Sequence, residues 1–252
     1  MKYFFSLMIF CVPAAWCMAQ RTGPDWLVQV SGGLAAPLGD FGKKDGMPDY
    51  TTSSSGNSGW AKAGPLVNLC VGHQFKNSLF GLALSGSWQQ NARDNKALQE
   101  YEMKQSPGSD RVIVNAGKWK IWKVLAGPSV TLPVGHSGKW NFDCVLQAGI
   151  LKTAIPSYSY VVYMNNNPSI AGNTSSQSMK AAFCYRLSPG LNYLAGQKKN
   201  ISIGFALAYD AARPSIHYTY YSFPPSGGNG VAVHHDYQVS SLGLLLGVGF
   251  LF

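Results

Sequence analysis

Large apolar residues occupy every second position in long stretches of this chain, and the last stretch continues to the final residue. Over 242–252, one set of alternating positions reads Leu, Leu, Leu, Val, Phe, Phe, whereas the other set holds glycine or leucine. A period of two is typical of a β-strand, because successive side chains point to opposite faces. Chain termini usually fray, so a pattern that ends on Phe252 predicts a strand that is paired along its whole length.

The same alternation appears in seven further segments, and the connections between them are long and short in turn. Most of the segments are longer than the about 9 to 11 residues that a tilted strand needs to cross a bilayer. The eight predicted strands cover residues 25–36, 63–75, 79–90, 118–132, 140–151, 179–194, 201–210 and 242–252.

Within each predicted strand, large apolar residues share one face, and small or polar residues share the other. Eight strands leave an interior that side chains just fill, which is too narrow for the bulky face. The bulky face must therefore point outward into lipid. Unpaired strand edges are not tolerated in lipid, so the first and last strands must pair. The chain is predicted to be all-β: an eight-stranded antiparallel up-and-down transmembrane β-barrel with short periplasmic turns and long extracellular loops.

Composition agrees with a surface that is largely hidden from water, because charged residues make up only 12% of the chain. Residues 1–19 read as a signal peptide, with Lys2, an apolar stretch and a small-residue ending at Ala19. We therefore divide the chain into a signal peptide, 1–19, and a β-barrel domain, 20–252. The apolar stretch is too short for a transmembrane helix, and no later segment is long enough either.

The net charge of +9 suits an anionic lipid or glycan surface. Without a basic helix or an RNA-binding signature, we expect no nucleic-acid partner. Cys70, Cys144 and Cys184 lack metal-ligand spacing and are interpreted as small strand residues. We expect no metal and no cofactor.

Three stretches carry a resemblance to a known family: "GGLAAPLGDFG" over 32–42, "LAGPSVTLP" over 125–133 and "GVGFLF" over 247–252. With them, residues 25–252 resemble the eight-stranded bacterial outer-membrane β-barrel proteins, the OmpA/OmpX-like group. The resemblance implies residence in the outer membrane, with outer-membrane lipid and lipopolysaccharide as surroundings. It also implies folding by periplasmic chaperones and the barrel-assembly machinery, for which Phe250 and Phe252 would be the C-terminal signal. We expect a monomer.

Four charged residues are predicted to point into the barrel: Lys123, Asp143, Arg186 and Asp210. A turn centred near Gln197 would place Arg186 opposite Ala208 and Cys184 opposite Asp210, so that Arg186 and Asp210 lie diagonally. One interpretation is a network of ion pairs and hydrogen bonds that fills a closed barrel, because unpaired buried charge is costly. The alternative is a charged constriction in a narrow pore.

The third and fourth long loops are rich in tyrosine, which is typical of binding surfaces. The candidate surface comprises Tyr158, Tyr160, Tyr163, Tyr218, Tyr220 and Tyr221. The same stretches could simply extend the strands as ribbons above the membrane, and the two interpretations are compatible.

Enzymatic barrels need histidine and acidic groups near the rim, and His217 with the trio His234, His235 and Asp236 are the candidates. Adjacent strand residues point to opposite faces, so His235 could not converge with its neighbours. We expect no catalytic residues. The predicted role is non-enzymatic: envelope integrity, or surface interaction through the extracellular loops. The alternatives are a small-solute channel and, less favoured, a lipid A-modifying enzyme.

Overall fold

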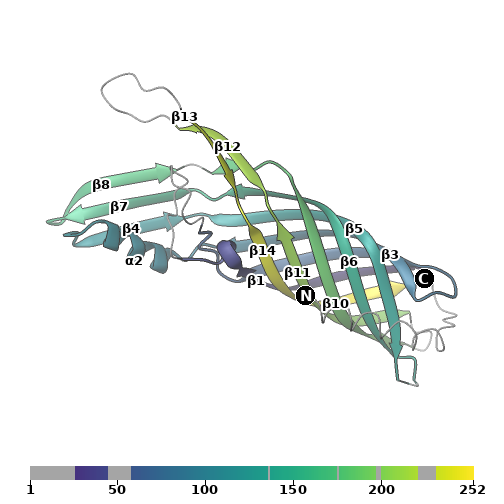
Figure 1. Ribbon diagram of the computed structural model, residues 1–252. Coiled ribbons are helices and arrows are strands. Elements are labelled where there is room, and N and C mark those ends of the chain that lie inside the picture. The colour runs from purple at the N-terminus through teal and green to yellow at the C-terminus, as the bar shows by residue number, and fades with distance from the viewer. Residues whose placement is uncertain (1–25, 45–57, 136, 175, 197–199, 221–230) are drawn as a thin grey trace, which may run out of the picture.

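The computed structural model describes residues 26–44, 58–135, 137–174, 176–196, 200–220 and 231–252, which form a barrel and a smaller folded body at one end (Figure 1). The predicted signal peptide, 1–19, lies outside these residues. Eight strands of the described chain build the barrel wall: β1 (Trp26–Leu38), β2 (Gly64–Gln74), β3 (Phe80–Ala92), β5 (Lys118–Val134), β6 (Trp140–Ile155), β10 (Ala182–Ala195), β11 (Ile201–Ala212) and β14 (Val239–Leu251).

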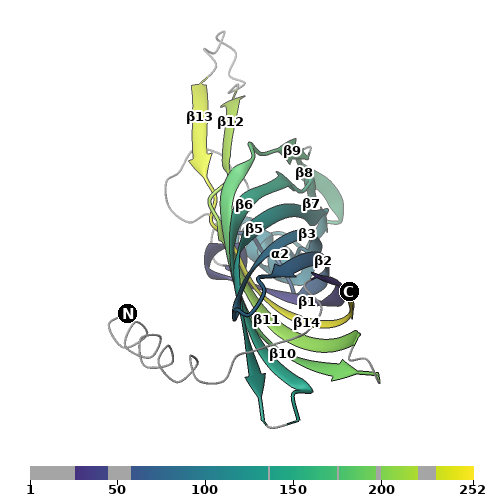
Figure 2. The ribbon, with the colours of Figure 1, turned by 90° about the vertical axis from the view of Figure 1, so that its right-hand side faces the viewer.

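The wall is closed and antiparallel throughout. Each strand pairs with its neighbours in the order β10, β11, β14, β1, β2, β3, β5, β6, and β6 pairs in turn with β10. Figure 2 shows β1, β14, β11 and β10 side by side along one wall. Trp26 and Phe252 exchange two backbone hydrogen bonds of 3.0 and 3.1 Å, so pairing of the first and last strands extends to the final residue. The predicted fold class is confirmed.

The two ends of the barrel differ. The strand ends next to the short connections lie at one end of the barrel, together with Trp26 and Phe252, and we name it the turn end. These strand ends are Gln74, Phe80, Val134, Trp140, Ala195 and Ile201. The long connections lie at the other, the loop end. In bacterial outer-membrane barrels short turns face the periplasm and long loops face the exterior.

The outer surface of the barrel is apolar, as predicted. On β14, Leu246 is 66% exposed whereas its neighbour Leu245 is 4% exposed, which fixes the outward face of the strand. Aromatic side chains border this surface at both ends. Trp88 and Trp122 lie 6.3 Å apart toward the loop end, and Trp140 and Tyr193 lie 5.0 Å apart at the turn end. Such aromatic girdles mark the two membrane interfaces.

Three strands and one helix form a folded body at the loop end, which we call the platform: α2 (Asn95–Gln105), β4 (Arg111–Ala116), β7 (Tyr158–Met164) and β8 (Asn167–Thr174) (Figure 1). The helix was not expected from the sequence, which predicted only a long loop between the strands 79–90 and 118–132. Its residues are mostly good helix formers, and Asp94 caps its start by accepting a 3.3 Å hydrogen bond from the backbone N–H of Ala97.

The remaining elements are short. A 3-10 turn, η1 (Gly39–Phe41), follows β1. The two-residue strand β9 (Gln177–Ser178) pairs with the last two residues of β6. A second ribbon is formed by β12 (Ser215–Tyr220) and β13 (Val231–Asp236). The two tyrosine-rich loops therefore do contain ribbons, in agreement with the second interpretation of these loops. Within the described ranges, no helix is both long enough and apolar enough to span a membrane.

Candidate functional site: the barrel lumen and the loop end

A charged cluster crosses the middle of the lumen. The carboxylate of Asp210 accepts hydrogen bonds from Nε and Nη2 of Arg186, at 2.6 and 3.1 Å, and from Nζ of Lys123, at 2.5 Å. All three residues are buried. Removing charges from water is costly unless each one is paired and hydrogen-bonded. The bidentate contact to Arg186 is the geometry that best compensates this cost.

Polar neighbours complete this cluster. Arg186 donates from Nη1 to Oδ1 of Asn68, at 2.7 Å, and from Nη2 to Oγ of Ser87, at 3.1 Å. Lys123 donates from Nζ to Oε1 of Gln89, at 2.9 Å. These contacts join β2, β3, β5, β10 and β11, so the cluster ties opposite walls of the barrel together.

The register between β10 and β11 differs from the prediction. Arg186 pairs directly with Asp210, and Cys184 pairs with Ala212. The predicted pairs, Arg186 with Ala208 and Cys184 with Asp210, are wrong by two residues because the connection is centred one residue later than Gln197. The predicted diagonal contact is therefore a direct cross-strand one, which explains its bidentate geometry.

Asp143, the fourth predicted charge, lies apart from this cluster. It accepts a hydrogen bond from Nδ2 of Asn192 and borders a cavity of about 130 Å³ that extends from Arg186 toward the turn end. We call this cavity the chamber. Its volume suits a few water molecules. Polar side chains that line it include Gln29, Asn68, Asn141, Asp143 and Asn192, together with the thiol of Cys70.

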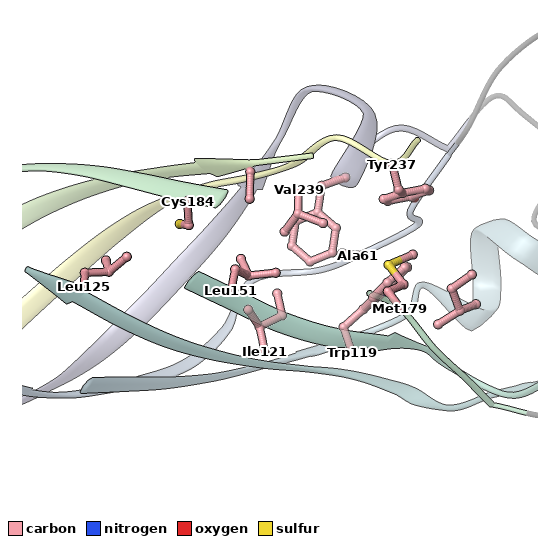
Figure 3. Close-up of a cluster of buried hydrophobic side chains, with 12 residues drawn as sticks. Ala61, Trp119, Ile121, Leu125, Leu151, Met179, Cys184, Tyr237 and Val239 are labelled. Atoms are coloured by element: carbon pink, nitrogen blue, oxygen red, sulfur yellow. The ribbon is translucent and has the colours of Figure 1, made fainter. Parts of the chain in front are cut away.

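Large apolar side chains fill the lumen at the loop end (Figure 3), and we call this group the apolar cluster. Trp119 lies at its centre, stacked on Tyr237 at 5.3 Å and edge-on to Phe41 at 5.4 Å between ring centroids. The indole Nε1 of Trp119 donates a 3.0 Å hydrogen bond to the carbonyl of Gly59. The members are Phe41, Ala61, Trp119, Ile121, Leu125, Leu151, Ile155, Met179, Cys184, Ala212, Tyr237 and Val239.

The expectation of a small-residue interior is therefore wrong for the loop-end part of the barrel. Strand β5 already contains the signal, since Trp119, Ile121 and Leu125 share the inward face with Lys123. At the loop end of β5 the exposed positions are Lys118 and Lys120 and the buried ones are Trp119 and Ile121, so polarity is reversed there, and the rule that the apolar face points outward missed this inward set. Because the apolar cluster and the charged cluster succeed each other along the axis, the described residues close the loop-end half of the lumen.

Arg93 connects the barrel to the platform. Its guanidinium carbon lies 5.7 Å from the ring centre of Trp119, in the apolar cluster, and 5.8 Å from that of Tyr158, in the platform. Tyr158 is buried with Trp60 and Leu98 in a core of its own, and its hydroxyl donates a 2.7 Å hydrogen bond to Glu102 of α2. The platform is therefore packed internally as well as against the barrel rim.

Asp94 fixes the start of the platform. Its carboxylate forms ion pairs with Lys44, at 2.7 Å, and Lys62, at 3.1 Å, besides capping α2 at Ala97. Burial raises the pKa of Asp94, but the hydrogen bonds from Lys44, Lys62 and the Ala97 backbone outweigh this effect and lower the pKa to about 2.

The predicted binding-surface tyrosines are placed differently from one another. Tyr158 is only 2% exposed, so it supports the platform from within and cannot contact a ligand directly. Tyr160 and Tyr163 are partly exposed on the platform, and the guanidinium of Arg111 lies 4.4 Å from the ring centre of Tyr163. Tyr218 and Tyr220 belong to β12, but their side chains lie outside the described part of the structure, as does Tyr221 entirely.

The histidine candidates fall in the same undescribed portion: the side chains of His217, His234 and His235 are not described, although their strands are. No group of three or more metal-binding side chains occurs among the residues that are described. At the other end of the chain, Phe250 and Phe252 are 57% and 68% exposed on the outer surface. Their role as an assembly signal stays a prediction.

A closed barrel of eight described strands with an apolar exterior defines the class of the chain: it has the fold of the integral outer-membrane β-barrels.

Among solved structures, the chain is similar to neisserial surface protein A, with 13% identity, 90% of this chain and 97% of that chain covered, and a TM-score of 0.45. It is also similar to Ail of Yersinia pestis (13% identity, 92% and 100% covered, TM-score 0.43) and to OprG from Pseudomonas aeruginosa (12% identity, 91% and 98% covered, TM-score 0.42). No protein-family model and no curated protein matches the chain. At these identities the likeness concerns the fold, and the role has to be inferred from the residues themselves.

Proposed function

We propose that this chain is a non-enzymatic outer-membrane protein that presents its platform as a surface for binding outside the cell. The observation that carries this proposal is the separate core of Trp60, Leu98 and Tyr158, which holds the loop residues in one arrangement. An ordered surface loses less conformational entropy on binding than mobile loops do. A core of this kind is not needed to close the barrel, whose wall is complete without it.

The side chains that fill the loop-end half of the lumen support a structural role for the barrel itself. The charged cluster and the apolar cluster connect opposite walls, so the barrel acts as a rigid support for the platform. A rigid barrel of this kind is also compatible with the proposed role in envelope integrity, which requires no ligand.

Binding can be tested with the protein embedded in nanodiscs and applied to an array of glycans and peptides. One variant replaces the β7–β8 ribbon (159–173) with a short turn, and a second, Y163S, changes only the partly exposed tyrosine that does not pack on the platform core. We expect both variants to lose binding to the same probes. The matched control is K76Q/K139Q, in which the changes lie at the turn end and should leave the array profile intact. An array profile that survives removal of the ribbon would overturn the proposal.

The second candidate function is a narrow solute channel, which is favoured by the polar chamber beside Asp143. Single-channel recording in a planar bilayer separates the two proposals. We expect no stable current steps, because the chamber ends at Arg186 and the apolar cluster lies beyond it. Reproducible steps from the purified protein would favour the channel.

A further inference from the structure

Two lysines project outward from neighbouring strands of the barrel, directly above the aromatic girdle at the loop end. Lys120 on β5 and Lys152 on β6 are both exposed. Lys152 is the cross-strand partner of Trp122, and Lys120 lies two residues further along the same outward face. Gln90 of β3 pairs with Lys120 on the other side. We call Lys120 and Lys152 the lysine pair.

The height of the lysine pair matches a membrane surface. Every outward position of β5 from Trp122 to Val134 is apolar. This stretch rises about 40 Å along the strand at about 3.3 Å per residue, or about 30 Å along the membrane normal at a tilt of about 40°. The hydrocarbon core of a bilayer is about 30 Å thick. Trp122 and its cross-strand partner Lys152 therefore lie at the edge of the hydrocarbon, and the long stem of Lys152 carries its charge to the lipid headgroups. Lys120, two residues further along β5, lies at the level of the headgroups.

The charges of the lysine pair are not compensated by the wall that carries them. Neither Lys120 nor Lys152 forms an ion pair with any described residue. The outward faces of β3, β5 and β6 contain no acidic residue. On the walls away from this site, the corresponding positions at the loop ends of β1 and β14 are the exposed leucines Leu38 and Leu242. The outward positions at the loop ends of β1 and β14 therefore carry no positive charge that corresponds to the lysine pair.

We infer that Lys120 and Lys152 bind the phosphate groups of lipids in the leaflet that surrounds the loop end. An ammonium group is a flexible point charge with three donors and suits a phosphate of variable position. Lysine stems lie along apolar surface while the charged head reaches the polar layer. Gln90 adds an uncharged donor next to Lys120. The site would hold one phosphorylated headgroup against the β3–β5–β6 wall and set the rotation of the platform relative to the membrane.

Native mass spectrometry of the detergent-solubilised full chain tests the inference, with lipid A carrying two phosphates as the probe and fully dephosphorylated lipid A as its comparison. The variant K120Q/K152Q keeps side-chain length and removes both charges. The matched control K76Q/K139Q removes two exposed lysines at the turn end. Each lysine near an anionic lipid surface contributes an amount equivalent to about a fivefold change in affinity, so we expect about a thirtyfold loss for K120Q/K152Q and little change for the control.

Folding does not confuse this test, because both side chains project from the outer wall and their loss should leave the β-sheet circular dichroism spectrum unchanged. The inference is overturned if K120Q/K152Q retains the phosphorylated lipid as well as the unmodified chain does. It is overturned equally if the control loses as much affinity as the test variant, or if the dephosphorylated lipid binds as tightly as the phosphorylated one.

Discussion

Asp210 balances two buried cations in the middle of the barrel. Its carboxylate contacts Arg186 through two hydrogen bonds and Lys123 through one. The neighbouring groups, Gln89 and Asn68, are uncharged amides that accept further donors from the two cations. The stability of the cluster therefore depends more on the single carboxylate than on either cation.

We predict that Asp210→Asn destabilises the folded barrel by about 3–5 kcal/mol, because it leaves Arg186 and Lys123 buried without a counter-charge. Lys123→Gln should cost clearly less, since the bidentate pair of Arg186 and Asp210 remains and is neutral overall. Urea unfolding of the lipid-embedded protein measures both free energies of unfolding. Equal losses for the two variants would contradict this account of the cluster.

The inward orientation of these charged side chains could be predicted from the sequence, but their interaction partners could not. Alternation with a period of two places Lys123, Arg186 and Asp210 on the inward face of their strands, and all three lie there. The pairing of Arg186 with Asp210 depends on the centre of the β10–β11 connection. A shift of one residue at that centre moves every cross-strand pair by two residues, and no feature of the sequence fixes it.

Among the secondary-structure elements, α2 is the one that the alternation of apolar and polar residues could not predict. Its residues are predominantly polar, so neither a strand pattern nor a strong apolar stripe marks the segment. The helix is held by Asp94 at its start and by Leu98, which packs with Trp60 and Tyr158. These contacts join segments that are far apart in the sequence, and only the folded chain brings them together. The β7–β8 and β12–β13 ribbons, by contrast, retain a local pattern and could be anticipated.

We predict that the platform loosens in acid through Asp94. The pKa of Asp94 is about 2 in the folded chain, below the about 3.9 of an unfolded aspartate, so its stabilising contribution is present above about pH 4. That contribution is lost as the pH falls from about 4 toward 2. Limited proteolysis of the loop end between pH 5 and 2 measures the change.

Asp94→Asn supplies the control, because it retains a capping oxygen for Ala97 but loses the ion pairs with Lys44 and Lys62. Its loop end should be cleaved more readily at neutral pH and should show a smaller further change in acid. A variant that follows the same pH dependence as the unmodified chain would assign the transition to another group.

The whole molecule has a lumen of two unlike halves: the polar chamber toward the turn end and the apolar cluster at the loop end. Two native thiols report on these halves, since Cys70 lines the chamber and Cys184 is buried in the apolar cluster. We predict that Cys70, as the sole thiol in a C144S/C184S mature chain, reacts with a charged methanethiosulfonate reagent. Cys184, as the sole thiol in C70S/C144S, should react only after unfolding. Rapid labelling of Cys184 in the folded barrel would show that water enters the apolar cluster and would contradict its close packing.

Closure of the barrel at Phe252 can be separated by experiment from the predicted recognition of Phe252 by the assembly machinery. Deleting Phe252 removes both backbone hydrogen bonds to Trp26, whereas Phe252→Ala retains them. We predict that the deletion lowers the free energy of unfolding by about 1–3 kcal/mol and that the alanine variant does so far less. Both should reduce the amount of folded protein in isolated outer membranes, because both lack the terminal aromatic ring. Normal assembly of Phe252→Ala would show that the aromatic ring of Phe252 is not part of the assembly signal.

The apolar cluster also has a consequence for the lifetime of the protein in its membrane. Phe41 and Tyr237 pack on Trp119 from the ends of long connections. Long loops of outer-membrane barrels face the exterior and have to cross the bilayer during insertion. We therefore expect this cluster to pack late. Withdrawal would require this packing to melt first, and the rate of that step sets how long the chain persists. We therefore expect insertion to work as a latch, which opens only when this packing is lost.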